Sequence, residues 1–215
     1  MSADKVFHPR SEGIPSEGVK DQYADGKAAR AWNKFIGDSN QRTQNYKDFL
    51  IGLLKKHGCK IDSMMLVDEG FGLVSIDASD KMLKHALKAR WEKRRNPKYD
   101  EWEANWETLP RDINSFLPGT QFDAVICLGN SFAHLLDEYG DQRVQKMCLE
   151  NFAKCLKPGG LLEFRLCYYP HKLDTFTKML DEAFGNRAAH SIYADFQPLS
   201  QVPVPGFYIH VMQKK

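Results

Sequence analysis

The sequence predicts an α/β fold, with a doubly wound, mostly parallel sheet, helices on both faces and an antiparallel edge strand. Apolar strand-like runs alternate with amphipathic helical patterns, which is typical of parallel sheets covered by helices. The apolar run at 71–76 ends in a single acid, Asp77, and a helical pattern follows at once. Two further strands near the C-terminus are too close in sequence for a crossover helix, so we expect an antiparallel hairpin there.

Composition and charge narrow the class of protein. The chain has 215 residues, of which 42% are hydrophobic, so one domain with a sizeable core is sufficient. Its 30 basic and 28 acidic residues nearly cancel, which gives no argument for binding nucleic acid or a membrane surface. There is no apolar stretch of bilayer length and no signal peptide, so we expect a cytoplasmic protein. The five cysteines lack CxxC spacing, so we expect neither disulfides nor a bound metal.

The N-terminal half begins with a polar stretch without periodicity, residues 1–22, which we interpret as an arm preceding a single domain at 23–215. The elements predicted next are a helix at 24–35, a helix at 42–57, a helix at 62–69, a strand at 71–76 and a helix capped by Ser79. Gly58 stands where a helix ending at position 57 needs a C-terminal cap.

In the C-terminal half, predicted strands and helices alternate more regularly. We interpret 99–118 as an aromatic loop, and the continuous apolar run at 122–128 predicts a fully buried strand. The remaining predicted elements are a helix at 141–156, a strand at 161–168, a helix at 172–184 and strands at 188–193 and 207–212. Met147 falls on the apolar face of the first of these helices.

Asp77 has two interpretations. In doubly wound sheets, an acid at the end of a buried strand binds the two hydroxyls of a nucleotide ribose. The same acid could instead cap the helix that follows it. The usual partner of a ribose-binding acid is a glycine-rich turn about twenty residues earlier, and residues 52–60 contain no such turn.

Two other groups of residues are candidate ligand contacts. Asn130 and His134 follow directly on the strand at 122–128, where such sheets place active-site loops, and an asparagine amide suits a small polar substrate. A structural turn explains them about equally well. Asn105 and Trp106 could contact an adenine ring, although core packing is the usual role of tryptophan.

Taken together, these residues resemble the glycine N-methyltransferases, class I methyltransferases that use S-adenosylmethionine. The resemblance covers almost the whole chain, and the antiparallel edge strand also suits this class. The matching stretches are DQYADG at 21–26, HGC at 57–59, VSIDASDKML at 74–83, ANW at 104–106, FDAVICLGNSFAHL at 122–135, PGGLL at 158–162, RLCYYPH at 165–171 and the segment at 207–211.

The resemblance implies a role for each matching position. Asp77 is the expected ribose-binding acid, and Asn105 and Trp106 are the expected adenine contacts. Arg42 is expected to pair with the methionine carboxylate. The other cofactor contacts that the resemblance implies are Tyr23, Trp32, Phe35, Leu128 and His134. The family has tyrosine at the position of Phe35, so that hydroxyl contact is lost. Asn130 is the expected glycine contact.

The departures from the family have the form of excisions. Between residues 60 and 61 the family has a strand and an acid-Ala-Cys-Gly-Thr-Gly turn, and a few family residues are also missing between 102 and 103. Some tens of residues are missing between 162 and 163, including a substrate-binding arginine. Arg165 is the nearest remaining candidate for that catalytic role. Either segments are absent from the recorded sequence, or the chain is a shortened product, such as that of a faulty transcript.

The resemblance implies transfer of a methyl group from S-adenosylmethionine to the amine of glycine, giving sarcosine and S-adenosylhomocysteine. It also implies a homotetramer and folate binding, to which the N-terminal arm contributes. One alternative is an impaired protein that binds the cofactor poorly, because loss of a central strand leaves backbone groups unpaired at about 1–3 kcal/mol each when buried. The other is an NAD-dependent oxidoreductase, whose last strand would run parallel to its neighbours.

Overall fold

The computed structural model describes residues 40–58, 72–79, 82–84, 87–88, 99–127, 131–135, 137–167 and 173–215. The predicted N-terminal arm and the helices at 24–35 and 62–69 lie outside these residues. The chain divides into two compact units, with the boundary between Asn105 and Trp106, and each unit is described by itself. Among the described helices, none is long and apolar enough to cross a membrane.

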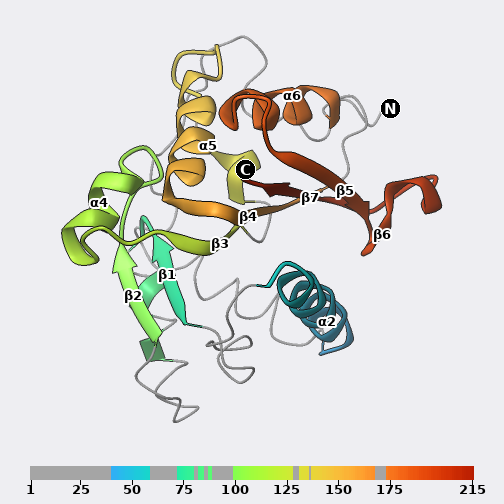
Figure 1. The fold of residues 1–215 in the computed structure, drawn as a ribbon, viewed down its shortest axis with the longest axis horizontal. Helices are drawn as coiled ribbons and strands as arrows, with labels where there is room; N and C mark the ends of the chain where they lie inside the picture. The colour runs from blue at the N-terminus through green and yellow to red at the C-terminus, as the bar shows by residue number, and fades with distance from the viewer. Residues whose placement is uncertain are drawn as a thin grey trace. The chain divides into compact units, whose positions relative to one another are not determined.

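The first unit contains one helix and a pair of strands. Its elements are α2 (Asn40–Lys56), β1 (Leu73–Asp77) and β2 (Tyr99–Glu103). The predicted helix end is confirmed: Gly58 has a φ of 69° and donates a backbone hydrogen bond of 3.1 Å to the carbonyl of Lys55. Strands β1 and β2 run parallel and side by side, as Figure 1 shows, in the register Leu73↔Tyr99 to Asp77↔Glu103.

The prediction of a loop over 99–118 was wrong. This stretch contains β2 and the helix α4 (Leu109–Phe116). The sequence of β2 is Tyr-Asp-Glu-Trp-Glu, which lacks the apolar run of a buried strand, so its conformation depends on backbone pairing with β1. Helix α4 has only two buried side chains, Leu109 and Ile113, and starts with a proline in its first turn.

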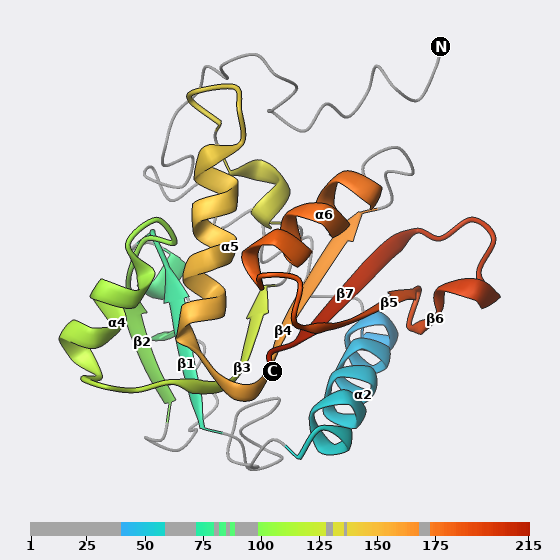
Figure 2. The same ribbon diagram turned by 45° about the horizontal axis from the view of Figure 1, so that its top comes forward.

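The second unit is built on a five-stranded sheet with the order β3-β4-β7-β5-β6. Its strands are β3 (Phe122–Cys127), β4 (Leu156–Cys167), β5 (Ala189–Ala194), β6 (Gln197–Pro198) and β7 (Phe207–Gln213). Helices α5 (Arg143–Cys155) and α6 (Leu173–Ala183) cover one face of this sheet (Figures 1 and 2). The predicted alternation of strands and helices is therefore confirmed here.

Strand β7 runs antiparallel to both of its neighbours. It pairs with β4 from Leu161↔Gln213 to Cys167↔Phe207, and with β5 from Ala189↔Gln213 to Ala194↔Tyr208. Strand β3, in contrast, runs parallel to β4. The predicted C-terminal hairpin is confirmed, and the parallel last strand expected of an oxidoreductase is not found.

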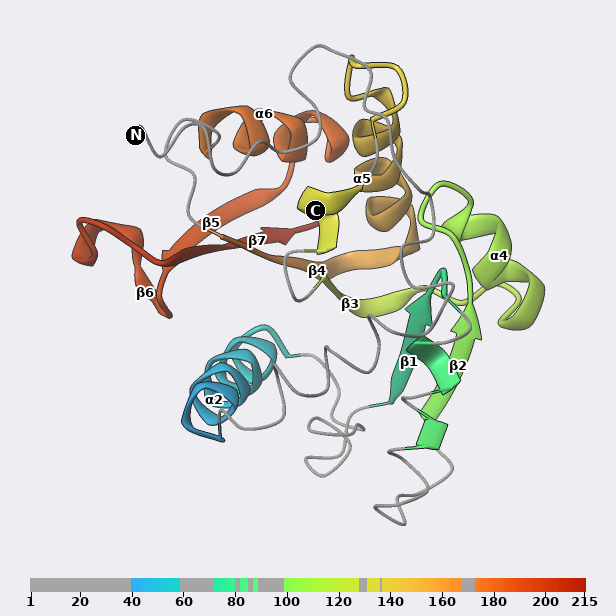
Figure 3. The same cartoon turned by 180° about the vertical axis from the view of Figure 1, so that it is seen from behind.

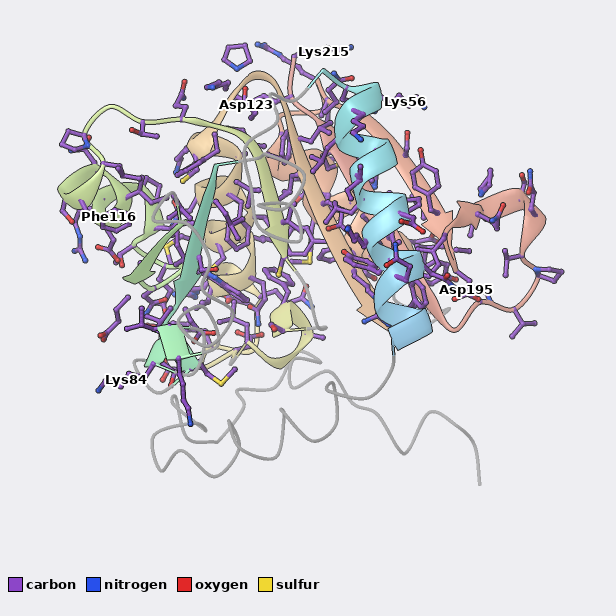
Figure 4. The ribbon with its side chains drawn as sticks, turned by 90° about the horizontal axis from the view of Figure 1, so that it is seen from below. Lys56, Lys84, Phe116, Asp123, Asp195 and Lys215 are labelled. Atoms are coloured by element: carbon purple, nitrogen blue, oxygen red, sulfur yellow. The ribbon has the colours of Figure 1, made fainter. Side chains whose placement is uncertain are left out.

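The hairpin between β5 and β7 is closed by Asp195. Its Oδ1 accepts a hydrogen bond of 3.2 Å from the backbone N–H of Phe207, and its Oδ2 accepts one of 2.9 Å from Gly206. Figure 4 labels Asp195 beside this hairpin and Asp123 on β3, toward opposite ends of the strand order. One carboxylate thus fixes the turn that reverses the chain direction.

Strand β3 is less buried than its sequence predicts. Only Cys127 is buried, and residues 122–126 are half-buried. Strand β3 lies at one end of the strand order, and among the described strands only β4 pairs with it. An apolar run suited to a central strand therefore stands at the end of the strand order that the structure describes. The predicted burial of Met147 was also wrong, since this side chain on α5 is 37% exposed.

Aromatic side chains fill the space between the sheet and its two helices. Phe164 of β4 contacts Phe152 of α5 at 5.6 Å, and Phe176 of α6 at 5.5 Å between ring centroids. Phe132, in the short 3-10 helix Ser131–His134, contacts Phe164 at 5.1 Å. Figure 3 shows α5 and α6 on this face from behind. Tilted and edge-on aromatic pairs of this kind stabilise the core beyond their buried area.

The end of α5 is capped by a lysine from far along the chain. The Nζ atom of Lys214 donates hydrogen bonds of 2.8 Å to the carbonyl oxygens of Ala153 and Leu156. The backbone of Lys214 also bonds to Gly159 and Gly160. A cation at a helix C-terminus satisfies carbonyls that lack a helical partner and opposes the negative end of the helix dipole.

We expect Lys214→Met to lower the free energy of unfolding by about 1–3 kcal/mol, because two carbonyl oxygens lose a charged donor. Urea unfolding followed by circular dichroism measures this change. Lys215→Met is the matched control, since Lys215 is exposed, and it should change the stability by less than about 0.5 kcal/mol. Equal effects of the two variants would contradict the capping role.

Candidate functional site

Asp77 ends strand β1, as predicted, at the carboxyl end of the parallel pair β1-β2. Its side chain is half-buried. Its backbone carbonyl accepts a hydrogen bond of 3.2 Å from the N–H of Ala104, just beyond β2. Asp77 and Asn105 are therefore brought to the same end of the two strands. Ligands bind at the carboxyl ends of parallel strands in open α/β sheets.

The carboxylate of Asp77 also starts the next helix. Its Oδ1 accepts a hydrogen bond of 2.9 Å from the backbone N–H of Ser79, and Leu83 donates its N–H to the carbonyl of Ser79. Ser79 stands at the N-cap position, as predicted, because its carbonyl accepts this first helical hydrogen bond, although its buried hydroxyl makes no hydrogen bond to any described residue. The capping interpretation of Asp77 is thus supported.

Glu103 is a polar residue of this edge that the sequence analysis missed. It is the register partner of Asp77, and its side chain is exposed. A signal was present, because each strand ends in an acid, an alanine and a polar residue: Asp77-Ala78-Ser79 after β1 and Glu103-Ala104-Asn105 after β2. The loop assigned to 99–118 concealed this similarity.

Trp106 begins the second unit and packs against its aromatic core. Its ring stacks on Phe132 at 6.2 Å and meets Phe152 edge-on at 5.5 Å. The Nδ2 atom of Asn151, on α5, donates hydrogen bonds of 3.0 and 2.8 Å to the carbonyls of Trp106 and Glu107. Asn151 is 6% exposed and was not identified from sequence. These contacts support a core role for Trp106, whose side chain still remains half-buried rather than fully enclosed.

Arg165 lies on β4, and its guanidinium carbon is 4.4 Å from the ring centroid of Phe207. Its side chain is half-buried. Glu163, two residues earlier on the same face of the strand, is only 1% exposed. The nearby Cys127 thiol has a pKa raised by its burial and by the Glu163 carboxylate. A stacked guanidinium has a fixed orientation, which suits the binding of a planar carboxylate.

Other predicted site residues cannot be compared with the structure. Tyr23, Trp32, Phe35, Leu128 and Asn130 lie outside the described residues. For Arg42, in α2, and His134, in the 3-10 helix, the structure describes only the backbone.

The described cysteine side chains are free thiols buried in the second unit: Cys127, Cys148 and Cys155. Burial raises the pKa of Cys148 to about 12 and that of Cys155 to about 11, so both stay protonated near neutral pH. In the part of the chain that the structure describes, no three histidine, cysteine or acidic side chains are arranged to hold a metal ion.

Comparison with solved structures identifies the fold. An S-adenosylmethionine-dependent methyltransferase from Clostridium acetobutylicum is similar with a TM-score of 0.64 at 12% identity, over 88% of this chain and 98% of that chain. The N-methyltransferase NodS from Bradyrhizobium japonicum is similar with a TM-score of 0.55 at 15% identity, over 82% of this chain and 98% of that chain. The fold is therefore that of the class I methyltransferases.

Comparison of sequences identifies the family. The chain is 40% identical to glycine N-methyltransferase from Rattus norvegicus, over 98% of this chain and 99% of the relative, and 39% identical to that from Homo sapiens over the same shares. It is 30% identical to glycine/sarcosine N-methyltransferase from Halorhodospira halochloris, over 85% of this chain and 64% of the relative. The chain belongs to the glycine N-methyltransferase family. No protein-family model matches it.

The alignment with the rat relative is longer than the chain itself. It extends over 292 positions, whereas the chain has 215 residues. The relative therefore has tens of residues that the chain lacks. The positions of these gaps at 60/61, 102/103 and 162/163 stay a prediction.

We expect Asn151→Leu to release the turn at Trp106, because two part-buried carbonyls lose their donor. The free energy of unfolding should fall by about 2–6 kcal/mol, at about 1–3 kcal/mol for each carbonyl left unsatisfied. Differential scanning calorimetry and the tryptophan emission spectrum check this.

Glu150→Ala is the control on the same helix, since Glu150 is exposed and makes only a surface ion pair with Lys154 at 3.7 Å. An unchanged melting temperature in the Asn151 variant would show that the two hydrogen bonds do not hold the turn.

Proposed function

We propose that this protein transfers a methyl group from S-adenosylmethionine to the amine of glycine, producing sarcosine and S-adenosylhomocysteine. The observation that carries this proposal is the 40% identity, over nearly the full length, to an enzyme named glycine N-methyltransferase. A glycine/sarcosine N-methyltransferase from Parasynechococcus marenigrum is also 38% identical over 61% of the chain. The class I fold supports a nucleoside-containing methyl donor.

The described residues fit the nucleoside part of that donor. A ribose presents two hydroxyl donors, and an ionised carboxylate accepts hydrogen bonds from both. Asp77 offers such a carboxylate at the carboxyl end of a parallel strand pair, with Asn105 at the same end. We assign Asp77 to the ribose, and Asn105 to the edge of the adenine ring.

When bound, S-adenosylmethionine supplies a methyl group on a positively charged sulfur, which an unprotonated amine can accept directly. The residues of this chain then need only to bind and orient the two reactants, and such positioning supplies most of the rate enhancement. We assign Arg165 to the carboxylate of glycine, because a guanidinium binds a carboxylate through two parallel hydrogen bonds. Asn130 is the second proposed glycine contact.

A catalytically impaired protein is the second candidate, and it rests on the residues that the chain lacks. The rat relative has tens of residues that this chain lacks. In the structure, β1 pairs only with β2, and β3 only with β4, among the described strands. Calorimetric titration with S-adenosylmethionine, together with a radiolabelled methyl-transfer assay on glycine, separates the candidates. Tight binding with turnover supports the enzyme, and the lack of both supports the impaired protein.

Asp77→Asn separates ribose binding from helix capping. The asparagine Oδ1 can still accept the N–H of Ser79, so we expect the melting temperature to stay within about 2 °C. The loss of charge should weaken S-adenosylmethionine binding by about 10-fold to 100-fold, since a hydrogen bond to a charged group contributes about 1.5–3 kcal/mol. Calorimetry measures both quantities.

Asp77→Ala is the companion variant and should lose both binding and stability, because the cap is removed as well. An Asp77→Asn protein that binds the methyl donor as tightly as the wild type would leave capping as the role of Asp77.

Arg165→Lys tests the glycine site. Lysine keeps the charge but lacks the planar two-pronged donor, so we expect the KM for glycine to rise by about 10-fold or more, from the loss of about 1.5–3 kcal/mol. The Kd for S-adenosylmethionine should stay within about twofold. Steady-state kinetics with glycine as the varied substrate checks this, and an unchanged KM would exclude Arg165 from the glycine site.

A further inference from the structure

Three polar side chains form a continuous hydrogen-bonded chain between α6 and the two C-terminal strands, in which the two histidines are buried and Asp181 is 39% exposed. His190 Nδ1 on β5 lies 3.2 Å from Asp181 Oδ1 on α6. His190 Nε2 lies 3.1 Å from His210 Nδ1 on β7. The side chain of His190 is 11% exposed, and His210 is 1% exposed. Neither histidine belongs to the methyl-transfer site proposed above.

The sheet register explains why the two imidazoles meet. His210 is the partner of Ile192, and His190 is the partner of Met212, so the two histidines are diagonal neighbours on one face of the antiparallel pair. This is the face that α6 covers. Phe176 of α6 meets the His210 ring edge-on at 5.0 Å between centroids, and Tyr208 lies 6.3 Å from it. The helix therefore shields both rings from water.

The two hydrogen bonds determine which nitrogen of each neutral imidazole carries the proton. The Asp181 carboxylate accepts the proton of His190 Nδ1, which leaves Nε2 of His190 as an acceptor for the N–H of His210 Nδ1. One added proton is compatible with this arrangement, because a charged His190 can donate from both nitrogens while His210 accepts at Nδ1. A second added proton is not compatible, since both nitrogens of the 3.1 Å contact would then carry hydrogen.

We propose that Asp181, His190 and His210 form an acid-sensitive latch, which holds α6 against the β5-β7 hairpin and opens when both imidazoles become protonated.

The electrostatic surroundings of the two histidines determine how the stability of the latch changes with pH. Burial, with a smaller contribution from His190, lowers the pKa of His210 to about 3. Burial also lowers the pKa of His190, although the Asp181 carboxylate opposes this shift. In the unfolded chain both histidines titrate near pH 6.5. Both pKa values are therefore lower in the folded state, so the stabilisation is complete above about pH 6.5 and is lost as the pH falls below it.

Few other titratable groups face the pair among the described residues. The titratable side chain of α6 that faces the two histidines is Asp181, and that of β7 is Tyr208. Glu182 of α6 forms a 3.9 Å ion pair with Lys146 of α5, and both side chains are about half-exposed. On β4, the register partner of His210 is Phe164, which carries no charge.

Hydrogen exchange of the full chain, followed by mass spectrometry, tests the latch. After correction for the intrinsic exchange rate, the opening equilibrium constant of peptides from α6 and β5 should increase at least 10-fold when the pH falls from 6 to 5. The opening constant of peptides from β3 should increase less over the same pH change. Equal increases throughout the chain would overturn the proposal, because they would indicate a general acid effect.

His210→Asn is the decisive variant. The asparagine side chain can place a polar atom near the position of Nδ1, so the contact with His190 remains possible while the titrating group is lost. The increase in opening for each pH unit should then be about 10-fold smaller than in the wild type. His57→Asn is the control, because His57 lies beyond the end of α2 in the other unit, and it should leave the pH dependence of α6 unchanged.

A measurement on the wild-type protein avoids any dependence on the folding of a variant. Histidine side-chain nuclear magnetic resonance should show that His210 stays neutral down to pH 5. A His210 midpoint near pH 6.5, or an unchanged pH dependence in His210→Asn, would overturn the proposal.

Discussion

Backbone pairing on both edges of β4 organises the unit that contains residues 106–215. One edge bonds in parallel to β3, and the other bonds antiparallel to β7. Because side chains alternate along a strand, one face of β4 presents Phe164 to the helices, and the other carries Glu163 and Arg165. The aromatic core and the proposed glycine site are therefore consequences of a single strand and its register.

The elements predicted correctly from sequence are those whose own residues determine their structure. Helix α5 has a strong apolar stripe, β1 and β3 are mostly apolar, and Gly58 is needed for a positive φ. Strand β2 could not be predicted in this way, because its charged sequence forms a strand only when β1 supplies the partner. Likewise, the burial of β3 depends on which strand stands beside it.

The candidate site was predictable where a residue's position along a strand limits its role, and not where tertiary contacts decide it. Asp77 was identified because it ends an apolar run. Its hydrogen bond to the N–H of Ser79 could not be separated in advance from capping by Ser79 itself. Asn151 was missed because its amide bonds to carbonyls 44 and 45 residues away in sequence. No local sequence pattern predicts a contact between residues so far apart in the chain.

The strand order also has a consequence for how the chain is synthesised. Strand β7 is the last in sequence, yet it stands between β4 and β5, and the only other described partner of β5 is the two-residue strand β6. A nascent chain that has released β4 and β5 from the ribosome therefore carries two strands awaiting a partner. Such non-local pairing folds slowly and leaves strand edges open to association with other chains. Until β7 has been made, the strand edges of β4 and β5 that it will cover therefore stay unpaired.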